Sequence, residues 1–142
     1  MVNCPDPFGC GLRAIAAMLI WTVFAAPIAA QPMLQCSGVQ KPWTVAELLF
    51  GGGRVSQAAW EVFLEAEVTP RFPDGLTVYD AKGQWRNPET KKISRERTKV
   101  VMIAMPPGAD NDARLQAVIE AYKTRFKQQS VGLILRPSCV SF

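Results

Sequence analysis

The sequence predicts an α+β domain of the ferredoxin-like, split βαβ class. This class has the element order βαββαβ, a four-stranded antiparallel sheet and two helices on one face. The first observation is that apolar residues follow strand and helix periods in this order along the chain. The second is a pair of cysteines, Cys36 before the first predicted strand and Cys139 after the last. The first and last strands of this topology are antiparallel neighbours, so both cysteines are expected at the same edge of the sheet.

The first predicted strand and helix follow a polar segment that contains prolines. Residues 31–44 are expected to be irregular, and residues 45–50 to form the strand. Ser56 suits the N-cap of a helix over residues 57–68. We expect this helix to end just before Pro70, because the residue that precedes a proline disfavours the helical conformation.

The middle of the chain predicts two strands separated by turns. The expected elements are a type I turn at 73–75, a strand at 76–79, a turn or bulge at 80–83, a resumed strand at 84–86, a turn at 87–90 and a long strand at 93–105.

An amphipathic stripe predicts the second helix. Its apolar residues recur at i, i+3, i+4, i+7 and i+11, namely Leu115, Val118, Ile119, Tyr122 and Phe126. Asp110, Asn111 and Asp112 offer a cap and negative charge at its start. Residues 131–135 are expected to form the last strand.

Residues 1–30 predict a secretory signal peptide. Residues 14–26 are almost wholly apolar, with Arg13 supplying positive charge before them. This apolar stretch has the length of a signal-peptide core and is short for a bilayer span. We expect cleavage after Ala30, which leaves Gln31 as the first residue; an uncleaved anchor helix is the alternative. The predicted location is therefore the periplasm or the exterior, with no stable membrane insertion after cleavage.

The mature part is expected to form one ferredoxin-like domain over residues 45–142. Its composition limits the chemistry that it can perform. The chain has 16 Lys or Arg, 12 Asp or Glu, a net charge of +4 and no histidine. Ser-His triads, Cys-His nucleophiles and His-ligated zinc or haem are thereby excluded, and we expect neither a metal nor a cofactor. Export also makes nucleic acid an unexpected partner.

The two cysteines of the mature part are expected to pair. In an oxidising compartment Cys36 and Cys139 should form a disulfide. Closing a loop of about 100 residues contributes on the order of 4–5 kcal/mol in the chain-entropy model. Two free thiols or a metal pair are the alternative.

One candidate site lies in the connector after the first helix. Pro70 and Pro73 are expected to hold Arg71 in an extended path, with Asp74 just downstream. Such an arginine beside carboxylates suits an anionic ligand or the orientation of a general base. The alternative is a purely structural corner, in which Arg71 pairs with Glu67 or covers the last helix carbonyls.

Further candidates lie on the two middle strands. Trp85 and Arg86 suit the wall of a ligand pocket or an interface, or simple packing against a helix. Glu96 is a candidate partner for either arginine, Arg71 or Arg86. Alternation places a basic row on one face of the long strand, either solvated or facing an anionic partner: Arg95, Arg97 and Lys99. The glycine triplet 51–53 is expected to be a flexible connector, since it lacks the residues of a phosphate-binding loop.

A continuous run of residues carries a resemblance to a known family. The run is TPRFPDGLTV at 69–78, then Asp80 and GQWR at 83–86, and the likeness continues through Arg95-Glu96 to Cys139 and Phe142. It resembles the signature of small exported bacterial proteins catalogued only as a domain of unknown function, over roughly residues 36–142. The glycine triplet at 51–53 departs from what is expected of this family. The departure bears on the length of the loop after the first strand and leaves the expected fold unchanged. The resemblance implies export and no known activity.

The leading functional hypothesis is a non-enzymatic module that binds a small anionic ligand or an envelope protein. Its candidate site residues are Arg71, Asp74, Trp85, Arg86 and Glu96. The first alternative is a carboxylate-based enzyme, such as a ferredoxin-like dimer, with Glu67, Asp74 or Glu96 as general base. The second is a structural envelope protein. A homodimer is also kept among the expected assemblies.

Overall fold

A computed structural model describes residues 34–53 and 55–142 of the chain. These residues belong to one compact unit, Pro32–Phe142, and the description below concerns that unit. The predicted signal peptide and its cleavage site between Ala30 and Gln31 lie outside the described residues and stay predictions.

The domain has the predicted order of strands and helices. The elements are β1 (Lys41–Gly51), α1 (Gln57–Phe63), a π-helical turn (Leu64–Val68), a 3₁₀ turn (Thr69–Arg71), β2 (Thr77–Arg86), β3 (Ile93–Met105), α2 (Asn111–Phe126) and β4 (Gly132–Val140).

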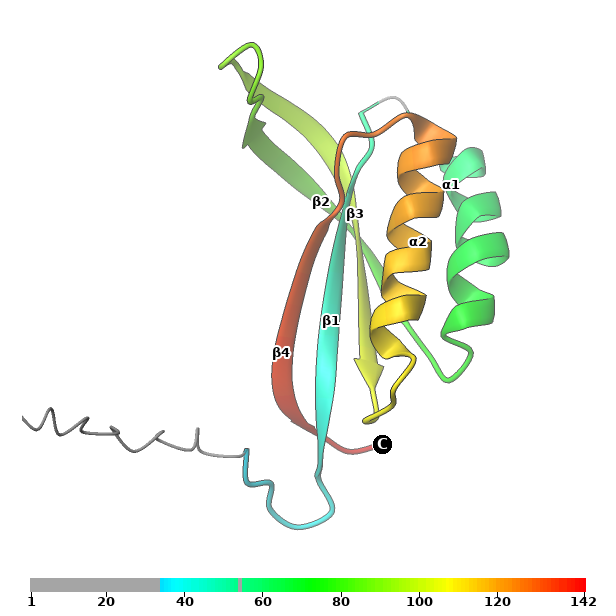
Figure 1. Cartoon of the computed structure of the whole chain (residues 1–142), viewed down its shortest axis with the longest axis vertical. Helices are drawn as coiled ribbons and strands as arrows, with labels where there is room; N and C mark the ends of the chain where they lie inside the picture. Colours follow the sequence, from blue (N-terminus) through cyan, green and yellow to red (C-terminus); the bar gives the residue numbers. More distant parts are fainter. Residues whose placement is uncertain (1–33, 54) are drawn as a thin grey trace, which may run out of the picture. The chain divides into compact units, whose positions relative to one another are not determined.

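The four strands form one antiparallel sheet in the order β2-β3-β1-β4. β1 is central and pairs antiparallel with both β3 and β4. Both helices lie on the same face of this sheet (Figure 1). The order and the layers confirm the predicted ferredoxin-like α+β fold.

The core lies between the sheet and the two helices. β1 and β3 each direct alternate residues towards the helices, and these are buried: Ala46, Leu48, Phe50, Val101, Ile103 and Met105. The α2 stripe is confirmed, because Leu115, Val118, Ile119 and Tyr122 are buried and Phe126 packs against the same cluster. The predicted β3 boundaries, 93–105, also match the structure.

The two neighbouring strands β1 and β4 are longer than predicted. β1 begins at Lys41, so residues 41–44 are not irregular, and β4 runs to Val140 rather than 135. The added residues pair with one another, from Lys41 opposite Val140 onwards. Each added segment contains a proline, Pro42 or Pro137, which weakens the local strand signal; the cross-strand hydrogen bonds decide their conformation.

The end of the first helix also differs from the prediction. Beyond Phe63 the chain continues through a π-helical turn and a 3₁₀ turn that includes Pro70 in its first positions. Proline is tolerated there because its missing N–H would have no partner in a first turn. Arg71 therefore sits in a helical turn and not in an extended path.

One smaller expectation fails and another is met in part, since Asp112 does supply negative charge in the first turn of α2. β2 runs unbroken from Thr77 to Arg86 in continuous register with β3, so residues 80–83 form neither a turn nor a bulge. Asp110 occupies the N-cap position of α2, but its side chain makes no capping hydrogen bond. Asn111 instead donates to the Pro106 carbonyl at 2.8 Å.

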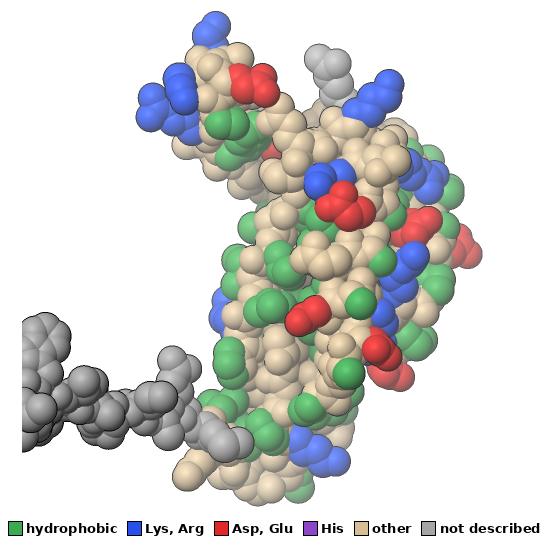
Figure 2. All heavy atoms as spheres, in the orientation of Figure 1, with side chains coloured by type: hydrophobic (Ala, Val, Ile, Leu, Met, Phe, Trp, Pro, Cys, Tyr) green, Lys and Arg blue, Asp and Glu red, His purple; other side chains and the backbone are tan. Residues whose placement is uncertain are grey.

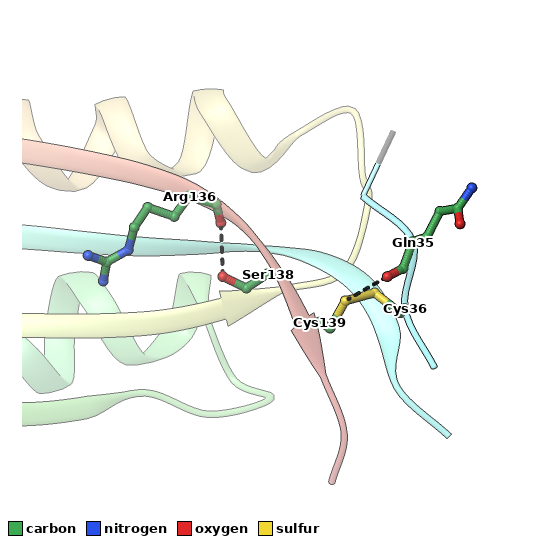
Figure 3. The surroundings of a disulfide bond; sticks show 5 residues. All are labelled: Gln35, Cys36, Arg136, Ser138 and Cys139. Carbon is green, nitrogen blue, oxygen red and sulfur yellow. Dashed lines mark hydrogen bonds between the residues drawn. A yellow bond between two sulfur atoms is a disulfide. The ribbon is translucent and has the colours of Figure 1, made fainter. Parts of the chain in front are cut away.

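The predicted disulfide is present. Cys36 and Cys139 are bonded, with their Cα atoms 5.5 Å apart. Figure 3 shows the bond joining the segment before β1 to the end of β4. Pro42 lies opposite Cys139 in the β1–β4 ladder, so the bond lies at the end of the ladder where β1 begins and β4 ends.

The second face of the sheet carries no helix, and three large apolar side chains on it are exposed: Tyr79, Met102 and Ile134.

Among the helices of the described residues, none is long and apolar enough to cross a membrane.

Candidate functional site

A cavity lies between the start of α1 and the β2–β3 pair. Its volume is about 450 Å³. It forms because β2 and β3 continue past the start of α1, which leaves their helix-facing side chains uncovered. The lining residues are Gly52, Val55, Ser56, Gln57, Trp60, Asp80, Ala81, Lys82, Arg97, Thr98, Lys99 and Tyr122.

Three cations and one carboxylate line the cavity. Lys99 Nζ lies 2.6 Å from Asp80 Oδ1 and donates to Gln57 Oε1 at 2.8 Å, which joins β3 to β2 and to α1. Lys82 and Arg97 form no ion pair with any described carboxylate. The lining thus keeps two cations in excess.

These two cations stand directly opposite each other. Lys82 pairs with Arg97 in the β2–β3 register, and both line the cavity. Side chains opposite each other on one face have Cβ atoms about 5 Å apart, and like charges in this position repel. An anion between them would relieve the repulsion.

The floor of the cavity is aromatic. Trp60 and Tyr122 are buried and belong to a cluster of rings with Phe50, Phe63 and Phe126. The Trp60 and Tyr122 ring centroids are 6.2 Å apart at 72°, an edge-to-face geometry that aromatic pairs prefer. The cavity therefore combines cationic side chains with an aromatic floor.

Tyr122 also links α2 to β1 by a hydrogen bond. Its hydroxyl donates to the Gly51 carbonyl at 3.0 Å. Burial of the hydroxyl, followed by the negative charge of Glu96, raises the pKa of Tyr122 to about 12 from its usual 10. The folded state therefore favours the neutral side chain.

The raised pKa predicts a pH dependence of stability for Tyr122→Phe. Since the folded pKa lies above the unfolded one, the stabilisation is complete below about pH 10 and is lost as the pH rises through about 12. At about pH 8 the wild type should be more stable by about 1 kcal/mol, because the variant lacks the hydrogen bond to Gly51. At about pH 12 the wild type loses about 2 kcal/mol relative to the variant, and the order reverses.

Urea unfolding of both proteins across this pH range measures the difference. Tyrosinate absorbance provides the control, because the variant keeps Tyr79 and should lack only the step near pH 12. A stability difference that stays constant from about pH 8 to about pH 12 would contradict the prediction.

The five candidate residues named from the sequence do not come together. Asp74 lines a small cavity of about 30 Å³ beside Met105, at the C-terminal end of β3. Trp85 pairs with Ser94 near the other end of β3. Eleven residues of strand separate these two positions, a span of about 35 Å.

Arg71 adopts the structural role that was the alternative expectation. Its Nη1 donates to the Glu67 carbonyl at 2.6 Å and lies 2.9 Å from Glu67 Oε2. Its own carbonyl accepts a hydrogen bond from Arg114, which anchors the corner to α2. Asp74 is exposed in the following turn, where the Gly75 N–H donates to the Phe72 carbonyl at 3.4 Å.

The remaining candidates lie on the β2–β3 pair but point to different places. Arg86 Nε donates to the Lys91 carbonyl, which holds the turn between the strands. Glu96 lies on the sheet face opposite Arg97, with its carboxylate so close to Gly51 that a side chain at Gly51 would collide with it. Neither Arg71 nor Arg86 pairs with Glu96 in the described domain.

The sequence predicts only part of the cavity. Alternation along β3 groups Arg97 with Lys99, and both line the cavity. Asp80 and Lys82 give no such signal, because residues 80–83 have the composition of a turn; in the structure a continuous strand puts both on the side of Arg97. Within residues 34–53 and 55–142, no group of three His, Cys, Asp or Glu side chains could hold a metal ion.

Comparison with solved structures shows similarity of fold at low identity. A phage SAM lyase in complex with S-methyl-5'-thioadenosine has a TM-score of 0.53 and 15% identity, over 75% of this chain and 88% of that chain. CutA1 from Oryza sativa has a TM-score of 0.51 and 10% identity, over 74% of this chain and 87% of that chain. At these identities the likeness concerns the fold alone.

Sequence comparison identifies one family. No curated protein matches the chain. One family model, described as "Protein of unknown function (DUF3574)", matches residues 46–142, which is the ferredoxin-like domain from β1 to the C-terminus. The chain therefore belongs to the DUF3574 family.

Proposed function

We propose that this protein is an exported module that binds a small anionic ligand in the cavity between α1 and the β2–β3 pair. The observation that carries the proposal is the placement of Lys82 directly opposite Arg97, both lining the cavity and neither paired with a described carboxylate. The repulsion between two such cations destabilises the hairpin, and an anion bound between them would relieve it.

The size and floor of the cavity narrow the ligand class. A volume of about 450 Å³ lies in the range of pockets that hold small molecules. Trp60 and Tyr122 contribute aromatic groups to the lining, and Ser56 and Gln57 contribute polar groups. We therefore infer a ligand with an acidic group and a planar apolar part.

The proposed location is the periplasm or the exterior. The predicted signal peptide at residues 1–30 supports it, and the disulfide between Cys36 and Cys139 is compatible with an oxidising compartment.

No specific observation favours the other functional hypotheses. The carboxylates considered as general base do not meet in the cavity: Glu67 is paired with Arg71, Asp74 lies in the corner and Glu96 is on the opposite sheet face. Asp80, which does line the cavity, is paired with Lys99. A structural envelope role and a homodimer both stay predictions.

A matched pair of fluorescent probes tests the proposal. The anion 8-anilinonaphthalene-1-sulfonate has an acidic group on a planar apolar body, and N-phenyl-1-naphthylamine is the same body without the sulfonate. We expect the anion to bind more tightly, and Lys82→Gln/Arg97→Gln to weaken it about tenfold or more, because each charged hydrogen bond contributes about 1.5–3 kcal/mol. Binding of the neutral probe should not change.

Arg95→Gln is the control, and it removes one positive charge where the double variant removes two. Arg95 lies two residues from Arg97 on the same strand face and does not line the cavity. Its loss should leave the affinity for the anionic probe within about twofold. Equal weakening in both variants would show a general charge effect, and unchanged binding in the double variant would place the probe elsewhere; either result contradicts the proposed site.

A further inference from the structure

The net charge of this protein is concentrated in one element. Residues 82–97, here called the distal hairpin, hold six of the chain's 16 Lys or Arg and two of its 12 Asp or Glu. The hairpin thus has a net charge of +4, equal to that of the whole chain. In the rest of the chain the basic and acidic residues are equal in number, so their charges cancel. Figure 2 shows Lys and Arg side chains gathered at the end of this hairpin.

The distal hairpin projects away from the rest of the domain. β1 pairs with β3 only up to Thr98, so beyond that residue the β3 ladder is formed with β2 alone. Figure 1 shows the hairpin extending past the other two strands. Nothing else in the described domain covers its end, which can therefore meet a flat surface.

The end of the hairpin is held in one shape. The Asn87 side chain accepts hydrogen bonds from the backbone N–H groups of Glu89 and Thr90, at 2.8 and 2.9 Å. The Asn87 N–H donates to the Lys92 carbonyl, and the Lys91 N–H to the Asn87 carbonyl, both at 2.9 Å. A preformed loop loses little conformational entropy when it docks.

Apolar side chains accompany the charges at this end. Trp85 is 37% exposed and Ile93 49% exposed, although both are large hydrophobic residues. The register places them on opposite faces of the hairpin, Trp85 beside Ser94 and Ile93 beside Arg86, so both can meet one surface only where the end of the hairpin approaches it tip first. Tryptophan is enriched where a polar and an apolar phase meet, and basic residues beside it are attracted to anionic lipid. A soluble polyanion would use the charges but not the exposed apolar groups.

We propose that the distal hairpin docks onto an anionic lipid surface. The basic side chains of its end, namely Arg86, Lys91, Lys92 and Arg95, face the headgroups, while Trp85 and Ile93 enter the interfacial region from the two faces of the hairpin. The surface differs from the ligand cavity: Lys92 and Arg95 belong to the docking end and do not line the cavity. Docking of the hairpin therefore does not depend on the proposed ligand, and either proposal can fail without the other.

Vesicle binding tests the proposal. The exported protein should bind vesicles of phosphatidylcholine mixed with phosphatidylglycerol, bind pure phosphatidylcholine far less, and dissociate at high salt. Lys92→Gln/Arg95→Gln should lower partitioning about 25-fold, since each basic residue near an anionic membrane contributes about fivefold. Neither side chain forms an ion pair or hydrogen bond with the described residues, so the variant should fold normally, as circular dichroism would show.

The control variant Lys41→Gln/Lys123→Gln removes the same charge outside the distal hairpin, on β1 and α2. It should lower partitioning by about twofold at most. Trp85 gives an independent signal: its emission should move to shorter wavelength on the mixed vesicles, and Trp85→Phe should abolish the shift. Equal losses in the two charge variants, absence of the shift, or binding to soluble polyphosphate but not to vesicles would each overturn the proposal.

Discussion

Removal of the Cys36–Cys139 disulfide is expected to lower the free energy of unfolding by about 4 kcal/mol. The bond joins residues 103 positions apart, so it restricts the unfolded chain over almost the whole domain. In the native state it closes the edge where β1 and β4 meet, beside the pairs of Lys41 with Val140 and Pro42 with Cys139. Domains of this size have a total stability of about 5–15 kcal/mol, so the loss is a large share.

The double variant Cys36→Ala/Cys139→Ala measures this effect without leaving a reactive thiol. Urea unfolding should show a lower midpoint and a larger m-value, because the unfolded chain without the cross-link exposes more surface. A reducing agent should shift the wild type to the midpoint of the variant and leave the variant unchanged. Equal midpoints of oxidised wild type and variant would show that the bond adds no stability.

Truncation of Phe50 to alanine is expected to destabilise the domain by about 3–5 kcal/mol. Phe50 lies on the central strand β1 with 0% of its surface exposed. Its ring centroid is 4.7 Å from that of Tyr122 and 5.3 Å from that of Trp60. The truncation removes buried apolar surface and leaves a cavity beneath the two aromatic residues that floor the proposed ligand site.

Phe142→Ala provides the matched control. Phe142 is fully exposed, at 102%, and its one aromatic contact within the described residues is with Trp43 at 5.7 Å. The same substitution there should change the unfolding free energy by less than about 1 kcal/mol. Phe50→Leu should fall between the two, at about 1–2 kcal/mol, because most of the buried volume is kept. Similar effects at positions 50 and 142 would contradict the assignment of Phe50 to the core.

The elements that local patterns describe well were predicted well. β3 is found at 93–105 and α2 buries the predicted stripe, because a long apolar run and a helical period are properties of adjacent residues. The ends of β1 and β4 were missed, since Lys41 and Val140 become strand residues only through pairing with each other. The unbroken path of β2 through residues 80–83 has the same origin.

The candidate site shows the same division. Alternation along one strand was enough to group Arg97 with Lys99, but not to show that Lys82 faces Arg97 from the neighbouring strand. Asp74 and Trp85 are only 11 positions apart in the sequence, and the fold places them near opposite ends of β3.

The sequence by itself determined the order of the elements, the edge at which Cys36 and Cys139 meet and the excess of positive charge on the middle strands. Only the tertiary structure decided that Lys82 and Arg97 line one cavity over Trp60 and that the five candidate residues do not share a site. The physical reason is that periodicity is set by neighbouring residues, whereas strand register depends on hydrogen bonds and packing between distant ones.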